Sequence, residues 1–530
     1  MKRWNGWGDS AINFELTDSI LDLIGTIFGD MTPTQDMTPE DILTGIPDSP
    51  IPDSQGLNIN KTDRLNHSRG QSFPDWIALR HGNIRHFPDA VAYPENHEDI
   101  QNVIQYAEKN KAAIIPYGGG TSVCGHINPS SGPQPVITLD MSRMNQLLFL
   151  DEFSGLATFG AGITGKELEN VLNSRSWTLG HYPQSFELST LGGWIATRSS
   201  GHQSLHYGRI EDMFAGGKVE TGQGTFNLLE FPASAAGPDM KQLILGSEGR
   251  FGVITRATMR VHKLPESERF YGTLFKNWDA GMNAVKETVQ RNTQLSMMRL
   301  SDPVETEINF RLSGKKQAEF LKERFLPRFG FGNETSLLLF GITGDKKTVH
   351  QTRKKARSIF RSHGSSPLIE YLGKSWYRKR FHIPYVRNAL WDAGLGLDTL
   401  ETAVSWSKVN DMTVMVKTAI ESAMEKMNQR VLVFFHLSHI YPDGASVYVT
   451  YLFKRCQNPD ELHCRWQEMK SAASKTIVKL GGTISHQHGV GIDHKPYLQS
   501  EKGVLGISAI RAAKTVFDPN SIFNPGKLVD

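Results

Sequence analysis

Two histidines flank a glutamine near the C-terminal end of the chain, in the segment His486-Gln487-His488-Gly489-Val490-Gly491. Residues two positions apart lie on the same side of an extended segment, so His486 and His488 can face one pocket. Gln487 can hydrogen-bond a ligand but cannot titrate. The same histidines could bind a metal or lie on the surface; His494 is near, but no third metal ligand is evident, and we expect no metal site.

Three loops rich in glycine and small hydroxyl residues indicate a second kind of chemistry. They are residues 116–123 (PYGGGTSV), 183–212 (PQSFELSTLGGWIATRSSGHQSLHYGRIED) and 246–255 (GSEGRFGVIT). Small side chains let the backbone approach a flat or charged ligand, and free amides can bind a pyrophosphate without lysine. Each loop alone could be a surface turn. Together, at this spacing, they predict a cradle around one large cofactor.

The elements around the first loop are typical of an α/β arrangement. Residues 90–94 are expected as a strand, 97–109 as a helix and 114–116 as a strand that enters the loop. Further strands are predicted at 136–140, 156–160 and 252–264, with a helix at 164–172. Beyond Pro265 the pattern changes to strands at 271–275, 296–300, 337–342, 431–435 and 445–453, with helices at 278–291, 346–361 and 460–480.

We therefore expect an α+β fold, with a two-subdomain α/β cofactor domain and an α+β cap built on an antiparallel sheet. A chain of 530 residues is too long for one compact core. The expected division is an N-terminal helical segment and connector (1–85), the cofactor domain (86–265), the cap (266–480) and a C-terminal segment that returns to the active site (481–530).

Composition excludes several classes of protein. A net charge of +3 argues against bulk nucleic-acid binding. Cys124, Cys456 and Cys464 form no CxxC pair, which fits a reducing compartment without structural zinc. Neither a signal peptide nor a membrane-spanning run is evident. These features predict a soluble protein, or one that is at most peripheral to a membrane.

Two amphipathic segments could contact other surfaces. The first has apolar residues at Ile20, Leu21, Leu23, Ile24, Ile27 and Phe28. We expect it to pack on the protein as a helix, because it lacks the basic residues that favour a bilayer. The second, residues 346–361, carries seven basic residues and no acidic ones. It is interpreted as a solvated helix face that could also meet anionic lipid headgroups.

The order of these motifs resembles the FAD domain of the vanillyl-alcohol-oxidase-type flavoproteins. Within that group the middle loop is most similar to the alkyldihydroxyacetonephosphate (alkylglycerone-phosphate) synthases, and the similarity extends from residues 2–8 (KRWNGWG) to the end. The resemblance implies non-covalent FAD, although Cys124 or His126 could tether the flavin. It assigns these residues to FAD: Pro116, Tyr117, Gly118, Gly119, Gly120, Thr121, Ser122, Gln184, Ser185, Glu187, Ser189, Thr190, Gly193, Thr197, Arg198, Ser199, Ser200, Gly246, Glu248, Gly249, Gly252 and Ile254.

The resemblance also assigns roles to side chains of the cap. Tyr448 matches the base that takes a proton from the substrate carbon. Because a free phenol has a pKa of about 10, this role requires a histidine or the flavin to lower it. Arg387 matches an arginine that holds the substrate phosphate, and Arg299 matches another functional arginine. Without the resemblance, Tyr448 could be a core residue and either arginine a surface ion pair.

The family has three histidines where this chain has His486, Gln487 and His488. The resemblance makes the two histidines catalytic residues that tune Tyr448 and handle the leaving carboxylate. The departure at the middle position puts any acid–base role there in doubt, and we assign Gln487 to substrate binding.

The implied reaction exchanges the acyl chain of acyl-dihydroxyacetone phosphate for a long-chain fatty alcohol, in ether-lipid synthesis. It would proceed through a covalent flavin–substrate adduct without net redox. The same fold supports an FAD-dependent 2-hydroxy-acid dehydrogenase or oxidase of the D-lactate or glycolate type, and Gln487 keeps this alternative open. A flavin-binding scaffold is a third interpretation, in which Tyr448 and the histidines are incidental.

The resemblance also bears on where the protein works. The chain begins at the Trp-Asn-Gly-Trp motif, without the long presequence of peroxisomal members. We therefore expect a bacterial cytoplasmic enzyme, with peripheral membrane contact and a homodimer both left open.

Overall fold

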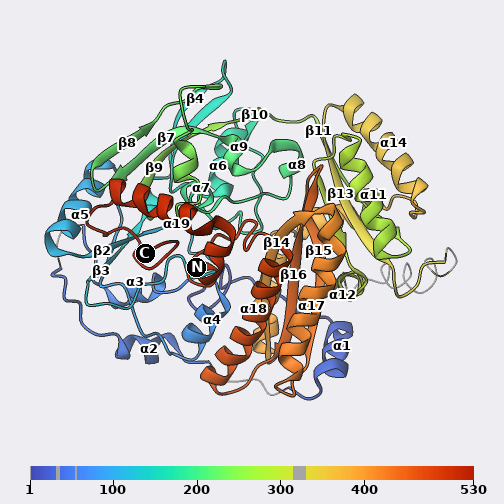
Figure 1. The fold of residues 1–530 in the computed structure, drawn as a ribbon, viewed down its shortest axis with the longest axis horizontal. Helices are drawn as coiled ribbons and strands as arrows, with labels where there is room; N and C mark the ends of the chain where they lie inside the picture. Colours follow the sequence, from blue (N-terminus) through green and yellow to red (C-terminus); the bar gives the residue numbers. More distant parts are fainter. Residues whose placement is uncertain (1, 32–35, 54–55, 314–326, 328–329) are drawn as a thin grey trace.

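The computed structural model describes residues 2–31, 36–53, 56–313, 327 and 330–530. Figure 1 shows most of the blue and green segments on one side of the molecule and the yellow and orange segments on the other, where the blue helix α1 (Asp18–Phe28) also lies. The C-terminal helix α19 (Leu498–Phe517), in red, lies across the blue and green side. Phe523 then forms a parallel bridge with Ile114, so the end of the chain packs beside the first glycine loop.

The first part of the cofactor domain is a three-stranded parallel sheet in the order β1-β3-β2. Its strands are β1 (Ala90–Ala92), β2 (Ala113–Tyr117) and β3 (Val136–Asp140). Helix α5 (His97–Asn110) connects β1 to β2 and buries its apolar stripe, which includes Ile100 and Ile104. Strand β2 delivers the chain directly into the first glycine loop, as predicted.

The second part is a five-stranded antiparallel sheet in the order β4-β5-β9-β7-β8. Its strands are β4 (Leu147–Asp151), β5 (Leu156–Gly160), β7 (Phe214–Thr221), β8 (Gly224–Leu228) and β9 (Val253–Arg260), and it packs with α6 (Gly165–Asn173) and α7 (Leu191–Thr197). The long strand expected at 252–264 is wrong at its end. It breaks after β9, and β10 (His262–Lys263) pairs instead with β6 (Trp177–Thr178).

The cap is a six-stranded antiparallel sheet in the order β11-β13-β12-β15-β16-β14. Its strands are β11 (Ser267–Phe275), β12 (Met297–Ser301), β13 (Ser336–Gly344), β14 (Leu395–Ser405), β15 (Val431–Ile440) and β16 (Gly444–Lys454). The strands predicted at 431–435 and 445–453 are confirmed as β15 and β16, which pair as an antiparallel hairpin, whereas β14 was not predicted. It pairs with β16 along its whole length, from Leu395 opposite Lys454 to Ser405 opposite Gly444.

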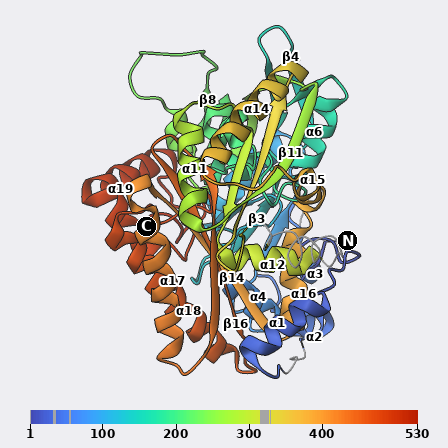
Figure 2. The same cartoon turned by 90° about the vertical axis from the view of Figure 1, so that its right-hand side faces the viewer.

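Helices cover the two faces of the cap sheet differently. The main core packs one face against α11 (Trp278–Gln290), α14 (Lys346–Ser362), α17 (Val409–Glu425) and α18 (Pro459–Leu480). Figure 2 shows α17 and α18 on one side of β14 and β16, with α1 (Asp18–Phe28), α12 (Pro303–Ser313) and α16 (Val386–Asp392) on the other. Because side chains alternate along a strand, Val447, Val449 and Tyr451 enter the core, whereas Tyr448 and Thr450 face away from it.

Short elements join these units. They are α2 (Pro39–Gly45), α3 (Lys61–Asn66), α4 (Phe73–Arg80), α8 (Ser204–Tyr207), α9 (Ile210–Met213), α10 (Lys241–Ile244), α15 (Glu370–Lys379), η1 (Met141–Arg143), η4 (Ile383–Tyr385), η5 (Trp406–Lys408) and η6 (Lys495–Tyr497). The connector expected within residues 1–85 thus contains short helices such as α2. Across the described residues, no helix combines the length and hydrophobicity needed to cross a membrane. The expected α+β class, with an antiparallel cap, is confirmed.

Candidate active site

One cavity of about 470 Å³ is lined by all three glycine loops and by the cap sheet. Most residues predicted to bind FAD line it, although they come from distant parts of the chain. They are Pro116, Tyr117, Gly118, Gly119, Gly120, Thr121, Ser122, Gln184, Ser185, Ser189, Thr190, Gly193, Thr197, Ser199, Ser200, Glu248, Gly249, Gly252 and Ile254.

The packing of the glycines tests whether these loops fit a large flat cofactor. A Cβ at Gly119 would lie 1.8 Å from the carbonyl oxygen of Leu188, so the first and second loops pack backbone to backbone. A Cβ at Gly193 would meet only Thr190 Oγ1, at 3.4 Å, among the described atoms, and Gly193 lines the cavity. The loops therefore hold each other closely while leaving room on the cavity side, as a cradle for FAD requires.

Three residues predicted to bind FAD lie outside the cavity lining: Glu187, Arg198 and Gly246. Arg198 donates hydrogen bonds from Nε to the Leu245 carbonyl and from a terminal nitrogen to Gln242 Oε1, at 3.1 and 2.7 Å. A Cβ at Gly246 would lie 3.2 Å from Nε of Arg198. Arg198 and Gly246 thus hold the third loop against α7. They lie next to cavity residues in the sequence but do not line the cavity.

The structure offers no support for a tether at Cys124. Its thiol is fully buried, does not line the cavity, and donates a hydrogen bond to the His488 carbonyl at 2.9 Å. His126 lies on the cavity wall, with Nδ1 2.7 Å from Ser122 Oγ and Nε2 3.2 Å from Glu248 Oε1. The Cys124 thiol thus joins the first loop to the C-terminal segment, and the His126 ring joins it to the third loop.

Tyr448 lies at the centre of the cavity side of the cap sheet. Register places Glu401 of β14 on one side of it and His436 of β15 on the other. The His436 ring stacks on Tyr448 with centroids 4.8 Å apart, and the Tyr448 hydroxyl donates to Thr399 Oγ1 at 3.1 Å. Burial raises the pKa of Tyr448 above its ordinary value, so the lowered pKa expected from the neighbouring histidines is not found.

The structure separates the members of the His486-Gln487-His488 segment. Gln487 and His488 line the cavity, whereas His486 is buried and does not. His488 lies edge-on to Tyr448, with ring centroids 5.7 Å apart. Its burial lowers the pKa of His488, which favours the neutral imidazole. The expectation that both histidines face one pocket is therefore wrong for His486.

The two predicted arginines line the same cavity but differ in their partners. Arg299 donates to Glu305 Oε1 at 2.6 Å, so its charge is already paired with a carboxylate. Arg387 donates from one terminal nitrogen to the Gln71 carbonyl and stacks 4.3 Å over the Trp76 ring. Its Nε and other terminal nitrogen are buried and have no hydrogen-bond partner among the described residues. Arg387 is thus the better placed of the two to receive an anion.

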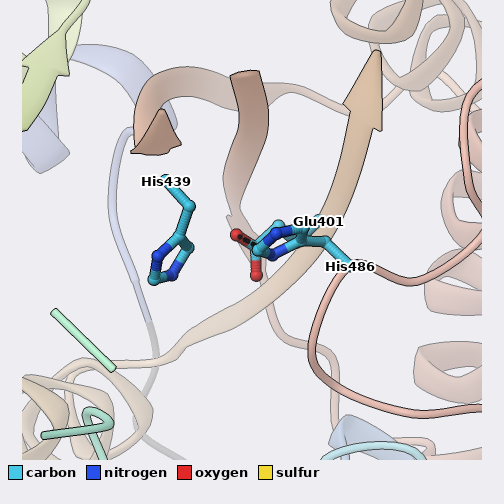
Figure 3. Close-up of side chains that lie close together, drawn as sticks. All are labelled: Glu401, His439 and His486. Carbon is cyan, nitrogen blue, oxygen red and sulfur yellow. Dashed lines mark ion pairs between the residues drawn. The ribbon is translucent and has the colours of Figure 1, made fainter. Parts of the chain in front are cut away.

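Three buried groups, Glu401, His439 and His486, lie close enough together to consider a metal, since their ligand atoms are within 4.8 Å of one another (Figure 3). The hydrogen bonds argue against this. Arg209 lies 2.7 Å from His486 Nε2, and a guanidinium can only donate, so that nitrogen must accept. The ring proton is then on Nδ1, 3.2 Å from Glu401 Oε1, where a metal would need a free lone pair.

Several residues at the site were not predicted from the sequence. Arg209 lies inside the YGRIED motif, and Glu401 lies on the unpredicted strand β14. His436 and His439 follow the predicted end of β15, where the alternation of Leu437 with polar residues could have extended the strand. Sequence alone gave no signal for the pairing that brings these four side chains together.

Comparison with known proteins identifies the two parts of the chain. Residues 88–228 match the family described as FAD binding domain, and residues 264–528 match FAD linked oxidases, C-terminal domain. The alkyldihydroxyacetonephosphate synthase of Dictyostelium discoideum is 35% identical over 487 residues, which cover 90% of this chain and 79% of that protein. The synthase of Caenorhabditis elegans is 30% identical, over 100% of this chain and 95% of its own length.

A solved structure agrees with these relatives. An alkyldihydroxyacetonephosphate synthase superimposes with a TM-score of 0.85 at 30% identity, covering 99% of this chain and 98% of the other. The cofactor is FAD, bound non-covalently, as expected. The chain belongs to the alkyldihydroxyacetonephosphate synthase family and is an FAD-dependent enzyme of this type.

Proposed function

We propose that the enzyme exchanges the acyl chain of acyl-dihydroxyacetone phosphate for a long-chain fatty alcohol. The observation that carries this proposal is that one cavity joins the FAD cradle, an apolar arm and Arg387, two of whose buried nitrogens have no hydrogen-bond partner among the described residues. When bound, FAD supplies a ring that can bond transiently to the substrate carbon, so that the exchange needs no net oxidation.

The apolar arm follows from the register of three cap strands. On the cavity side, β14, β16 and β15 align three rows of side chains. The rows are Glu401, Tyr448 and His436; then Thr399, Thr450 and Phe434; then Leu397, Leu452 and Leu432. With a rise of about 3.3 Å per residue, Tyr448 and Leu452 are about 13 Å apart along the strand. The surface thus changes from titratable to apolar over the length of a fatty-chain segment.

Apolar side chains from three helical segments face the same end of the cavity. They are Leu16, Ile20, Leu23 and Ile24 at α1, Ile308 and Leu312 of α12, and Val386 and Leu390 of α16. Each buried methylene contributes about 0.8 kcal/mol, so such a lining favours long alkyl chains. A short polar hydroxy acid has no alkyl chain to fill this arm. The arm therefore favours the synthase over the dehydrogenase alternative.

We assign the substrate phosphate to Arg387. Its buried Nε and free terminal nitrogen can donate two parallel hydrogen bonds to a phosphate, which is the geometry that arginine provides best. Gln487, on the cavity wall, can hydrogen-bond an ester or carboxylate oxygen without changing charge. Arg299, paired with Glu305, is assigned to orient His436, to which it lies 3.2 Å away.

We assign removal of the substrate proton to Tyr448. Because burial keeps this phenol protonated, it must first pass on its own proton. His488, with its pKa lowered by burial, is neutral and edge-on to Tyr448, so it is assigned to hold that proton. The fatty acid leaves as its carboxylate, and the alcohol releases its proton as it adds. Tyr448 then returns the substrate proton to the carbon and His488 returns the phenolic proton to Tyr448, so the exchange is balanced.

An isotope-exchange assay tests the proposal. Purified holoenzyme is incubated with acyl-dihydroxyacetone phosphate and labelled free fatty acid, without an electron acceptor. Label should enter the acyl-dihydroxyacetone phosphate, and added fatty alcohol should yield the alkyl product. No exchange, together with turnover of D-lactate or glycolate that requires an acceptor, would overturn the proposal and favour the dehydrogenase.

A further inference from the structure

We propose that His486 is a positioning residue, clamped between Arg209 and Glu401, and that Glu401 stabilises the protonated form of His488, the histidine that faces the substrate. The inference deepens the proposed function, on which the acid–base use of His488 rests. The contacts that hold His486 in place can be tested without measuring activity.

Arg209 links three separate segments at this point. It lies between α8 and α9 in the cofactor domain, and one terminal nitrogen donates to His486 Nε2 at 2.7 Å and to the Tyr441 hydroxyl at 3.1 Å. The other terminal nitrogen donates to the His486 and Arg198 carbonyls, both at 3.1 Å. The guanidinium therefore fixes both the ring and the backbone of the C-terminal segment against the cofactor domain and the cap.

These contacts determine the tautomer of His486. Since Arg209 can only donate, Nε2 accepts and the proton of a neutral ring is on Nδ1. That nitrogen lies 3.2 Å from Glu401 Oε1, the pair joined by the dashed line in Figure 3. Nε2 is held by Arg209, whereas Nδ1 is buried beside Glu401 without the geometry of a hydrogen bond, and the ring is outside the cavity lining. Neither ring nitrogen of His486 therefore reaches the substrate cavity.

Glu401 connects the clamp to His488. The carboxylate is buried, and its Oε1 accepts a hydrogen bond from Ser438 Oγ at 2.8 Å. Burial alone would raise the pKa of Glu401, but the neighbouring imidazole of His486, with those of His439 and His488, holds it well below its ordinary value. Its Oε2 has no hydrogen-bond partner among the described residues and lies 4.0 Å from His488 Nε2. A proton that arrives on His488 would place a positive charge within ion-pair distance of this oxygen.

Several other groups also shift the pKa of His488. Glu401 and Asp398 of β14 favour its protonated form, whereas burial, Lys470 of α18 and His486 oppose it; Tyr448 of β16 faces it as a neutral phenol. Of these charges, that of Glu401 favours the protonated form most strongly. Removing that charge should therefore lower the pKa of His488 further.

The first experiment reads the tautomers in holoenzyme labelled with ¹⁵N at histidine only, with signals assigned by His486→Gln and His488→Gln. His486 should show the Nδ1–H tautomer in the native protein and lose that preference in Arg209→Met, with Arg209→Lys retaining it in part. An Nε2–H tautomer for His486 in the native protein would overturn the clamp, as would stoichiometric zinc or manganese that Glu401→Gln removes. This readout does not depend on the reaction catalysed.

The second experiment compares pH profiles of the exchange reaction. Neutral His488 is needed, so its pKa sets the acid limb of kcat/KM. Glu401→Gln should move this limb to lower pH and decrease kcat by about 10- to 100-fold, whereas Glu421→Gln, on the exposed face of α17, should change neither. His488→Gln should abolish the limb and His486→Gln should keep one. The reverse pattern for the two histidines would overturn the inference, whereas a native enzyme without exchange activity would refute the proposed function alone.

Discussion

The FAD cradle and the proposed catalytic cluster, which comprises the polar side chains on the cap side of the cavity, are built in opposite ways. The cradle consists of three short segments whose small residues bring backbone close to backbone, as Gly119 does against Leu188. The cluster consists of single functional groups from separate strands and segments, such as Tyr448 of β16 and Arg387 of α16. We therefore expect a larger side chain in a cradle loop to abolish FAD binding. Removing a few atoms from the cluster should abolish activity and leave FAD binding intact.

The largest effect should come from adding volume to the cradle. Gly119→Val would drive a side chain into the Leu188 carbonyl, and Gly193→Val would fill the cavity side of the second loop. Both variants should lose bound flavin, measured by absorbance of the purified protein. Gly132→Val is the matched control, because its Cβ would meet nothing within 4 Å. Full flavin content in both cradle variants would show that the loops do not hold the cofactor.

Removing one oxygen from the cluster should decrease turnover without affecting the cradle. Tyr448→Phe keeps the ring stacked on His436 and removes only the hydroxyl that donates to Thr399. We expect kcat to fall by about 10²- to 10⁴-fold, the usual contribution of a positioned base, while flavin content and KM change little. Unchanged kcat would return Tyr448 to the role of a packing residue.

Shortening Arg387, the proposed phosphate ligand, should weaken substrate binding. Arg387→Ala removes both buried donors, so KM should rise by about 10- to 100-fold, in line with about 1.5–3 kcal/mol for a charged hydrogen bond. The KM of Arg387→Lys should rise less, because lysine keeps the charge but cannot donate two parallel hydrogen bonds. Arg357→Ala on the basic face of α14 is the control. Equal KM values in Arg387→Ala and the native enzyme would remove this residue from the phosphate site.

The smallest effect should appear in the apolar arm. Leu23 of α1 lines the cavity, whereas Leu21 on the same helix is 41% exposed and does not. Leu23→Trp should shorten the arm and raise KM several-fold for long-chain alcohols but not for short ones, at about 0.8 kcal/mol per excluded methylene. Leu21→Trp should leave the chain-length profile unchanged. A uniform change across chain lengths would contradict the arm as the alkyl site.

The difference between the two regions also explains what could be predicted from sequence. The cradle loops are contiguous motifs that can be seen in the sequence. Strands such as β3 and β5 are short runs whose observed bounds, 136–140 and 156–160, equal the predicted ones. Even there, Arg198 and Gly246 share a motif with cavity residues but point elsewhere. Sequence fixes neighbours along the chain more firmly than it fixes side-chain direction.

The cluster was only partly predictable because strand pairing creates it. Strand β14 escaped detection because polar residues such as Asp398 and Glu401 are buried on it, which obscures the hydrophobic alternation. Without β14, the partner of His486 and His488 could not be identified. Tyr448, Gln487, His488 and Arg387 line one cavity, whereas the separation of His486 from it depends on Arg209, which lies in the cofactor domain.

The most direct test of this account follows hydrogen exchange at the substrate carbon next to the carbonyl, with the flavin spectrum recorded in the same sample. Native enzyme and Tyr448→Phe are incubated with acyl-dihydroxyacetone phosphate in deuterated water, without an electron acceptor. The account predicts incorporation of deuterium by the native enzyme, its loss in Tyr448→Phe, and equal flavin content with no lasting reduction in both. Lasting bleaching of the flavin without deuterium incorporation would contradict it.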